Sequence, residues 1–413
     1  MKIDTLIISK NFPPIEGGIQ TYMFELANNW KAGKPYILCE LEKNEPSTQN
    51  VPFDIRRYEN KEMGYFKAVA SLTKLLFHKP KKFGKAFILL FLLFINRSII
   101  IKMVTLSQHV HDILNKTSKP TIIQCSTAMY VGAVGMLAKI LYNYPLVIYI
   151  HGTELNKYHQ RKNINLLYKF IIRNADTVIS NSHFTKDLAI KNGAKEENIV
   201  VFNLGANIHK YYPQSSKSQI CDLHNISENS TILLTVSHLI ERKGHELVLY
   251  ALNKIVQKYK NIHYFIVGQG PNKTKLQNLV QELKLEKHVT FTGFIEDKNI
   301  PIYMNACDIF VMPNREINGD FEGFGIVFLE ANACRKPVIG GRSGGVTDAV
   351  IDKETGLLIS SNNIDELEDK IMYLIDNPQK ADELAQRGYE RVVNELNWES
   401  VVQKINQYLV ERI

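Results

Sequence analysis

Two glutamates flank a glycine-rich turn in the segment GDFEGFGIVFLE, residues 319–330. Glu322 and Glu330 are eight positions apart, and Gly323 and Gly325 lie between them. At about 100° per residue, a helix would place both carboxylates on roughly one face. Carboxylates accept hydrogen bonds from sugar hydroxyls, and glycines let the backbone approach a ligand closely. The same spacing also fits an ordinary helix with one terminal and one exposed glutamate.

The neighbouring sequence favours a ligand at this turn. The apolar run CDIFVMP precedes it as a predicted strand, and a helix is expected to begin near Phe324. Ligands of parallel α/β sheets bind beyond the carboxyl ends of strands. A helix N-terminus at that edge offers unpaired backbone N–H groups, which suit phosphate. A phosphate in the middle and a polyol at either end describe a nucleotide sugar.

Two other segments offer groups that bind phosphate. PPIEGGIQTY is a turn after the predicted first strand, and it contains Gly17 and Gly18. SHLIERKGHELVL follows a predicted strand at 231–237, and its Arg242 and Lys243 could balance a diphosphate. Taken singly, a Gly-Gly turn is a common connection and an Arg-Lys pair is usually solvated surface. Together with the glutamate segment, they predict a cleft between two domains.

Three further residues are candidates for the same cleft. His151 opens the segment HGTE directly after the predicted strand PLVIYI. A histidine there often caps or packs against a strand, but Gly152 and Glu154 beside it favour a functional role. Tyr22 and Glu25 lie on the helix behind the Gly-Gly turn, where they either contact an acceptor or form the cleft wall.

The elements that must position these residues alternate along the chain. Short β-branched runs are followed by amphipathic helical stretches, which predicts parallel sheets with helices on both faces. The expected strands are 3–9, 36–40, 121–125, 145–150, 176–180, 198–202, 231–237, 262–268, 288–292, 308–312 and 336–340. The expected helices include 18–31, 163–174, 243–259, 363–376 and 379–395. The two series predict an α/β fold of two doubly wound domains.

A polar stretch near 205–230 interrupts the alternation and marks the domain boundary. We therefore expect an N-terminal domain at 1–207 and a C-terminal domain at 208–396. The final segment, 397–413, has the pattern of an amphipathic helix and is expected to pack back onto the first domain.

The net charge of +8 is concentrated in one insertion at about 60–116. Between Met63 and His111 the chain has eight Lys and Arg and no Asp or Glu, which accounts for the whole excess. The apolar run at 86–95 is shorter than the roughly 20 residues of a spanning helix. Residues 67–102 therefore predict an interfacial helix on an anionic membrane surface, or else a buried helix with a solvated basic face. Because interleaved stacking aromatics are few, nucleic acid is not the expected partner.

Cysteine usage and the N-terminus bear on location. The five cysteines are scattered without close pairing, which argues against a zinc site or a disulfide framework and suits a reducing compartment. The first residues predict a β-strand rather than a signal peptide. The expected location is cytoplasmic, at the inner face of the cytoplasmic membrane.

Five segments, EGGIQTY, HGTE, HLIERKG, GDFEGFGIVFLE and GGVTDAVIDKETGLLI, occur in this order over nearly the full chain. Together they resemble the retaining glycosyltransferases of family 4, which have the GT-B architecture of two Rossmann-like domains facing across a cleft. The wording DFEGFGIVFLEANA is most similar to mannosyltransferases that act on phosphatidylinositol mannosides and to polysaccharide-assembly enzymes.

The resemblance implies roles around the donor diphosphate. Gly17 and Gly18 would approach it, Lys243 would neutralise it, and the backbone amides of Phe324 and Gly325 would cap a phosphate. No metal ion or other cofactor is then required.

Around the sugars and the base, the resemblance assigns the hexose to Glu322 and the ribose to Glu330. His151 would lie near the reacting sugar, and the loop at Phe294 and Ile295 would meet the base. The donor would be linked to GDP, with mannose favoured, or to UDP. The acceptor would be a hydroxyl of a glycan or a lipid-linked molecule. An epimerase of nucleotide sugars and a non-catalytic binder on the membrane remain alternatives.

One position departs from the family pattern. Members usually have an arginine five residues before the lysine, and this chain has His238 there. Either His238 or Arg242 must supply the missing charge, and the sequence leaves both possibilities open.

Overall fold

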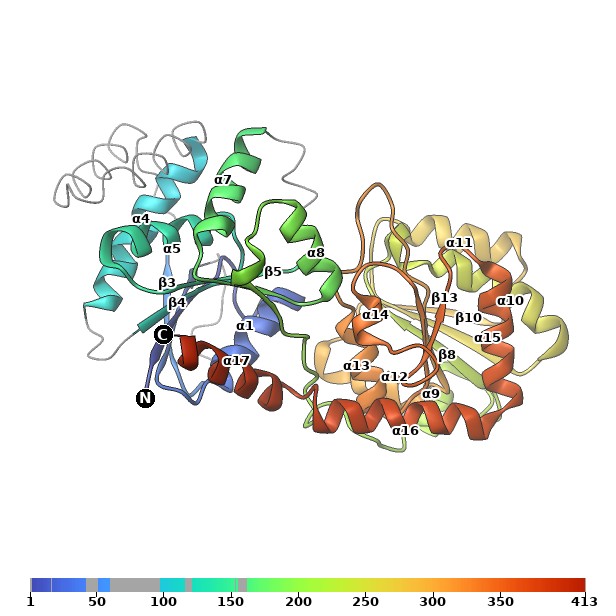
Figure 1. Cartoon of the computed structure of the whole chain (residues 1–413). Coiled ribbons are helices and arrows are strands. Elements are labelled where there is room, and N and C mark those ends of the chain that lie inside the picture. Colours follow the sequence, from blue (N-terminus) through green and yellow to red (C-terminus); the bar gives the residue numbers. More distant parts are fainter. Residues whose placement is uncertain are drawn as a thin grey trace. The chain divides into compact units, whose positions relative to one another are not determined.

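The computed structural model describes residues 2–15, 17–41, 51–59, 97–115, 121–152, 154 and 162–412. The chain divides into two compact units (Figure 1). The first comprises Met1–Phe202 together with Val401–Ile413, and the second comprises Asn203–Ser400. Each contains one parallel sheet with helical connections, so the predicted α/β fold with two doubly wound sheets is confirmed.

The sheet of the first unit has seven parallel strands in the order β3-β2-β1-β4-β5-β6-β7. They are β1 Asp4–Ile8, β2 Pro35–Glu40, β3 Asp54–Tyr58, β4 Thr121–Cys125, β5 Leu146–Ile150, β6 Thr177–Ser180 and β7 Ile199–Val201. Strands β1, β4, β5 and β6 are buried at every residue, as expected when helices cover both faces. The crossover helices are α1 Gly18–Asn28, α5 Val131–Tyr142, α7 Lys162–Asn174 and α8 His183–Lys191; the short helix η2 Glu196–Asn198 leads into β7.

Helix α4, Arg97–Leu114, is the described part of the predicted insertion at 60–116. Its residues Leu106 and Val110 are buried in the hydrophobic core of the first unit. The basic and apolar run at 67–96, on which the membrane prediction mainly depends, lies outside the described residues. Of the helices that the structure describes, none is both long and apolar enough to cross a bilayer.

The sheet of the second unit has six parallel strands in the order β10-β9-β8-β11-β12-β13. They are β8 Thr231–Val236, β9 Ile262–Val267, β10 Val289–Gly293, β11 Ile309–Met312, β12 Val338–Gly341 and β13 Leu357–Ile359. The helices are α9 Lys217–His224, α10 His245–Lys258, α11 Lys273–Glu282, α12 Ile300–Ala306, α13 Ile326–Ala333, α14 Val346–Ala349, α15 Ile364–Asp376 and α16 Pro378–Asn394, with short turns η3 Glu241–Lys243 and η4 Asp297–Asn299. The core contains Leu233 and Leu252, which are fully buried.

The C-terminal helix α17, Trp398–Arg412, belongs mostly to the first unit (Figure 1, red). Tyr408 packs against Phe202 of that unit, with ring centroids 5.6 Å apart. The helix therefore contacts a residue some 200 positions earlier in the sequence.

The first crossing between the units follows Phe202 rather than residue 207, where the polar stretch placed the domain boundary. The reason lies in backbone pairing. The N–H of Ala206 donates to the carbonyl of Leu396 at 2.8 Å, so the residues after Phe202 are tied to the second unit.

Candidate functional site

Glu322 and Glu330 lie in different kinds of structure. Glu330 is on helix α13, but Glu322 is in the loop before it. The helix begins only at Ile326, because Gly325 before it lies in the left-handed region, with φ of +91°, which a right-handed helix cannot include. The prediction that both carboxylates share one face of a helix is therefore wrong. The loop instead places Glu322 beside the short turn η3, which contains Arg242 and Lys243.

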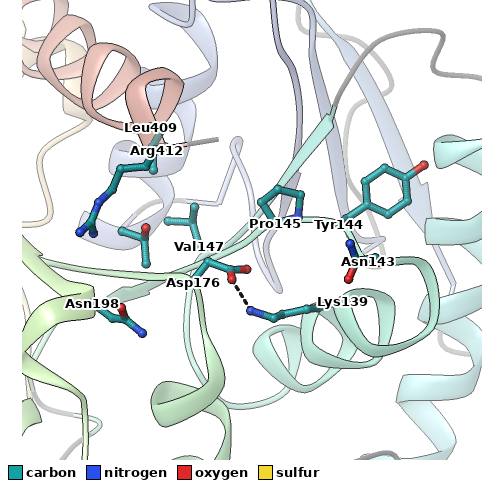
Figure 2. A pocket seen from close by; sticks show the side chains of 10 residues that line it. Lys139, Asn143, Tyr144, Pro145, Val147, Asp176, Asn198, Leu409 and Arg412 are labelled. Atoms are coloured by element: carbon teal, nitrogen blue, oxygen red, sulfur yellow. Dashed lines mark hydrogen bonds and ion pairs between the residues drawn. The ribbon is translucent and has the colours of Figure 1, made fainter. Parts of the chain in front are cut away.

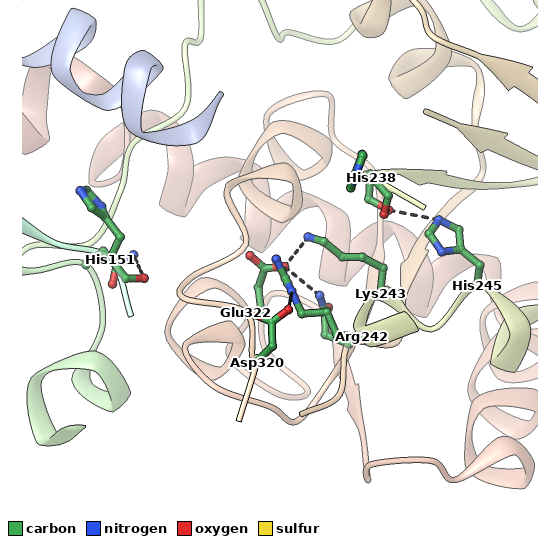
Figure 3. Close-up of polar contacts among 10 residues, drawn as sticks. His151, His238, Arg242, Lys243, His245, Asp320 and Glu322 are labelled. Atoms are coloured by element: carbon green, nitrogen blue, oxygen red, sulfur yellow. Dashed lines mark hydrogen bonds and ion pairs between the residues drawn. The ribbon is translucent and has the colours of Figure 1, made fainter. Parts of the chain in front are cut away.

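Glu322 is the centre of a compact polar cluster (Figure 3). Its Oε2 accepts hydrogen bonds from Arg242 Nη1 at 2.8 Å, from Asn314 Nδ2 at 3.1 Å, and from Lys243 Nζ. The side chains of Glu322, Lys243 and Arg242 are 14%, 11% and 15% exposed. Two segments about 80 residues apart in sequence therefore meet at one nearly buried carboxylate.

Each charged group in this cluster favours the ionised form of its partner. Burial by itself would raise the pKa of Glu322, but Lys243 and Arg242 outweigh it and hold that pKa below its ordinary value. Burial lowers the pKa of Lys243, and the carboxylate of Glu322 opposes that effect. Such a site can hold a charged ligand in a setting where electrostatic interactions are stronger than in water.

The structure distinguishes between His238 and Arg242, the two residues that could supply the positive charge of the family's arginine. Arg242 reaches Glu322, and its Nε also donates to Asp320 at 3.1 Å. His238 is exposed and lies away from this cluster (Figure 3). Arg242 is therefore the cation positioned beside Lys243.

A nearby histidine was missed in the sequence. His245 begins helix α10 and is 1% exposed, and its Nε2 lies 3.1 Å from Ser237 Oγ. Burial, with a smaller effect from Lys243, lowers the pKa of His245 to about 3. The imidazole is therefore neutral and adds no charge beside Arg242 and Lys243.

Backbone packing fixes the loop that contains Glu322. The N–H of Gly345 donates to the carbonyl of Glu322 at 2.8 Å. Gly344 has φ of +57°, and a Cβ there would lie 2.2 Å from the same carbonyl oxygen. Only glycine permits this approach, which explains why the segment GGVTD belongs to the site.

Glu330 lies in a second polar group on the same unit. Tyr211, 3% exposed, donates a hydrogen bond to Glu330, and Lys210 forms an ion pair with Asp297 nearby. Burial raises the pKa of Glu330 to about 7. Tyr211 and Lys210 were missed because they lie in the polar stretch that the sequence marked as a boundary.

Phe294 follows strand β10 directly, and its side chain is 56% exposed. It is among the large hydrophobic side chains that the second unit leaves open to solvent. An exposed aromatic ring offers a face for stacking, so its predicted contact with a base stays a prediction.

The glycines of the first unit lie where the sequence placed them. Gly17 precedes helix α1 and Gly18 begins it, and both are exposed. A Cβ on Gly18 would meet nothing within 4 Å, whereas one on Gly17, with φ of +151°, would meet the side chain of Gln20. The first turn of α1 therefore leaves its backbone N–H groups accessible to an anion.

His151 follows strand β5 and is held at several points. Its Nε2 lies 2.8 Å from the carbonyl oxygen of Ser126, which can only accept, so Nε2 carries the proton. Its backbone N–H donates to Glu154 Oε1 at 2.6 Å. The ring packs edge-on against Tyr22, with centroids 5.9 Å apart. The Ser126 carbonyl and Tyr22 thus fix the tautomer and orientation of the ring, and Glu154 holds the backbone.

Tyr22 and Glu25 lie inside the first unit. They are 1% and 6% exposed, and Glu25 Oε2 accepts a hydrogen bond from Asn29 at 3.1 Å. Their burial gives no support to the prediction that they contact an acceptor. Tyr22 instead packs beneath His151 and against Tyr149.

The first unit also has a pocket of about 430 Å³ that is separate from the predicted site residues (Figure 2). Its lining residues are Lys139, Asn143, Tyr144, Pro145, Val147, Asp176, Thr177, Asn198, Leu409 and Arg412. They gather at the amino ends of strands β5 and β6, where Lys139 pairs with Asp176. The predicted residues follow the carboxyl ends of strands, so this pocket contains none of them.

All five cysteines are free and buried. Within the described ranges, no three His, Cys, Asp or Glu side chains gather as metal ligands would. The expectation that no metal takes part stays a prediction.

Two family models match successive parts of the chain. The model described as Glycosyltransferase Family 4 matches residues 16–210, and the model described as Glycosyl transferases group 1 matches residues 217–391.

Curated relatives match part of the chain. A GDP-mannose-dependent alpha-(1-6)-phosphatidylinositol monomannoside mannosyltransferase from Mycobacterium tuberculosis is 30% identical over 208 residues, which are 50% of this chain and 54% of that protein. An N-acetyl-alpha-D-glucosaminyl L-malate synthase from Bacillus anthracis is 26% identical over 62% of this chain and 65% of its own length. The chain thus spans about half the length of the first of these relatives.

Among solved structures, the Anabaena protein HepE in complex with UDP and glucose superposes with a TM-score of 0.75. The two chains are 20% identical, and the match covers 98% of this chain and 99% of the other. At this identity the likeness establishes the shared fold.

Proposed function

This chain belongs to the glycosyltransferases of family 4, and from that premise we propose that it transfers a hexose from a nucleoside diphosphate sugar to a hydroxyl of a glycan or lipid-linked acceptor, with retention of configuration. Mannose linked to GDP is the favoured donor, because the Mycobacterium tuberculosis relative is named as dependent on GDP-mannose. UDP is the alternative nucleotide, because the HepE structure contains UDP.

The cluster of Arg242, Lys243 and Glu322 is the observation that carries this proposal. Two nearly buried cations lie beside one nearly buried carboxylate. The two cations can neutralise a diphosphate, and the carboxylate can accept hydrogen bonds from sugar hydroxyls. Asp320 also pairs with Arg242, but its side chain is 52% exposed, so this contact costs little to give up.

The chemical step requires stabilisation of the departing β-phosphate. Lys243 and Arg242 supply fixed positive charge, and the free N–H groups at the start of α13 supply dipoles. Glu322 orients the hexose by accepting from its hydroxyls. The acceptor oxygen forms the new bond to the anomeric carbon as the bond to phosphate breaks, and its proton passes to the departing phosphate oxygen.

Thermal unfolding with GDP, UDP, GDP-mannose and UDP-glucose tests the donor. The matching nucleotide is expected to raise the melting temperature, since a ligand that binds only the folded state stabilises it. Failure of every nucleotide to shift the transition would refute the proposal.

Transfer itself is measured with the acceptor presented in anionic and in neutral vesicles. If residues 67–102 contact the membrane, we expect faster transfer on anionic vesicles. The reason is that the chain has eight Lys and Arg and no Asp or Glu between Met63 and His111, so this segment is attracted to anionic lipid. Conversion of the donor sugar without any acceptor would instead indicate an epimerase.

The pH dependence of donor binding follows from Glu330. Its pKa is raised to about 7, so the carboxyl is largely protonated at pH 6 and ionised at pH 8. Ribose hydroxyls donate more strongly to the ionised form, so affinity should rise about tenfold over this interval. Calorimetric titration of nucleoside diphosphate measures the slope. Glu330→Gln, which cannot ionise, removes this contribution and leaves only that of the nucleotide phosphate; equal slopes in both proteins would contradict the assignment.

A further inference from the structure

Arg315 is a nearly buried arginine next to the cluster of Arg242, Lys243 and Glu322, and none of the roles described above involves it. It comes three residues after strand β11 and is 8% exposed. Its Nη1 donates to Asn362 Oδ1 at 2.9 Å, and its Nη2 donates to Glu246 and, at 3.4 Å, to Glu241. Its own backbone N–H donates to the carbonyl of Arg242 at 2.9 Å. Arg315 therefore links its own loop to two other segments, residues 241–246 and the turn at Asn362.

The basic and the acidic side chains of the segment ERKGHE, residues 241–246, form ion pairs with different partners. Arg242 and Lys243 face Glu322, whereas Glu241 and Glu246 face Arg315. Neighbouring residues of opposite charge are thereby kept from pairing with each other. Asn314, adjacent to Arg315, donates to Glu322, so this short loop contacts both sets.

We propose that Arg315 is a positioning residue that neutralises Glu241 and Glu246, and so keeps Arg242 and Lys243 available for the diphosphate of the donor. This inference rests on the proposed function. The side chain of Glu246 is 14% exposed, so its charge is poorly screened by water. Left without Arg315, that carboxylate would repel a diphosphate and attract the nearby cations.

The planar, branched guanidinium explains why arginine suits the position. A guanidinium presents several N–H donors in a plane and can reach Asn362 and two carboxylates together. A lysine has one point charge and would not bridge all three. Arg315→Lys should therefore restore only part of the function lost in Arg315→Met.

The test compares binding of nucleoside diphosphate and monophosphate, GDP with GMP and UDP with UMP, in the wild type and in Arg315→Met. The variant is expected to lose tenfold or more in affinity for the diphosphate and clearly less for the monophosphate. A triple variant that adds Glu241→Gln and Glu246→Gln should regain most of that affinity. Equal affinity of wild type and Arg315→Met, or a triple variant as weak as Arg315→Met, would overturn the proposal.

A second variant keeps Arg315 and thus covers the case in which Arg315→Met does not fold. In Glu241→Gln with Glu246→Gln, we expect diphosphate affinity equal to or above that of the wild type. If Arg315 acted only as a mechanical brace, loss of these ion pairs would weaken binding instead. A wild-type protein that binds no nucleoside diphosphate would refute the proposed function itself, which separates that failure from failure of the role of Arg315.

Discussion

Replacing Lys243 with methionine is expected to lower the kcat/KM of hexose transfer by ~10²–10³-fold, the range found when one preorganised donor to a developing anion is removed. Methionine preserves most of the side-chain volume and deletes the charge. The Lys243 side chain is 11% exposed, so water cannot easily substitute for it. Because leaving-group stabilisation is lost chiefly in the transition state, kcat should fall more than KM rises.

Lys254→Met is the matched control. Lys254 lies on helix α10 in the same unit, its side chain is 50% exposed, and it pairs with Asp365 and Glu368 at the surface. Exposed ion pairs contribute little, so this variant should transfer hexose at close to the wild-type rate. Retention of more than half of the activity in Lys243→Met, with the fold intact, would remove Lys243 from the mechanism.

Glu322→Gln is expected to separate nucleotide binding from sugar transfer. Glutamine has the same shape but cannot accept as a charged group, so hydrogen bonds from hexose hydroxyls weaken. Loss of such a bond corresponds to about 10–100-fold in kcat/KM. The same change frees Arg242 and Lys243 from their carboxylate partner. Affinity for the nucleoside diphosphate without sugar should therefore stay the same or increase.

Glu354→Gln serves as control, because Glu354 is an exposed residue of the same unit. Both measurements are made on each variant: calorimetric affinity for the nucleoside diphosphate and steady-state transfer. If Glu322→Gln lost diphosphate affinity in proportion to transfer, Glu322 would act on the phosphates or on the fold, and its assignment to the hexose would fail.

The two strands that sequence analysis missed are both at the edge of a sheet. Strand β3 has the sequence DIRRY and is only partly buried, and β13 has just three residues, LLI. Central parallel strands are covered on both faces and read as apolar runs, which made β4 and β8 visible. An edge strand need not be apolar, and its pairing depends on a neighbour distant in sequence.

The candidate site was predicted in composition but not in contacts. Glu322, Lys243 and Arg242 were named as site residues from the sequence. The structure shows that Lys243 and Arg242 both donate to one carboxylate oxygen of Glu322. Asn314 and Arg315 were missed because they follow a strand in an irregular loop, where no periodic pattern marks a residue's direction. Their importance appears only through partners 8 and 69 positions away.

By itself, the sequence determined the alternation of strands and helices, the two-sheet architecture, and the glycine-rich turns at strand ends. These follow from local preferences: apolar periodicity selects the element, and glycine permits the backbone angles of the turn. The tertiary structure alone decided that Arg242 rather than His238 accompanies Lys243, that Glu322 precedes its helix, and that acids and bases of one short segment face opposite partners. Side chains in irregular loops take their direction from segments packed against them, and only the folded chain brings those segments together.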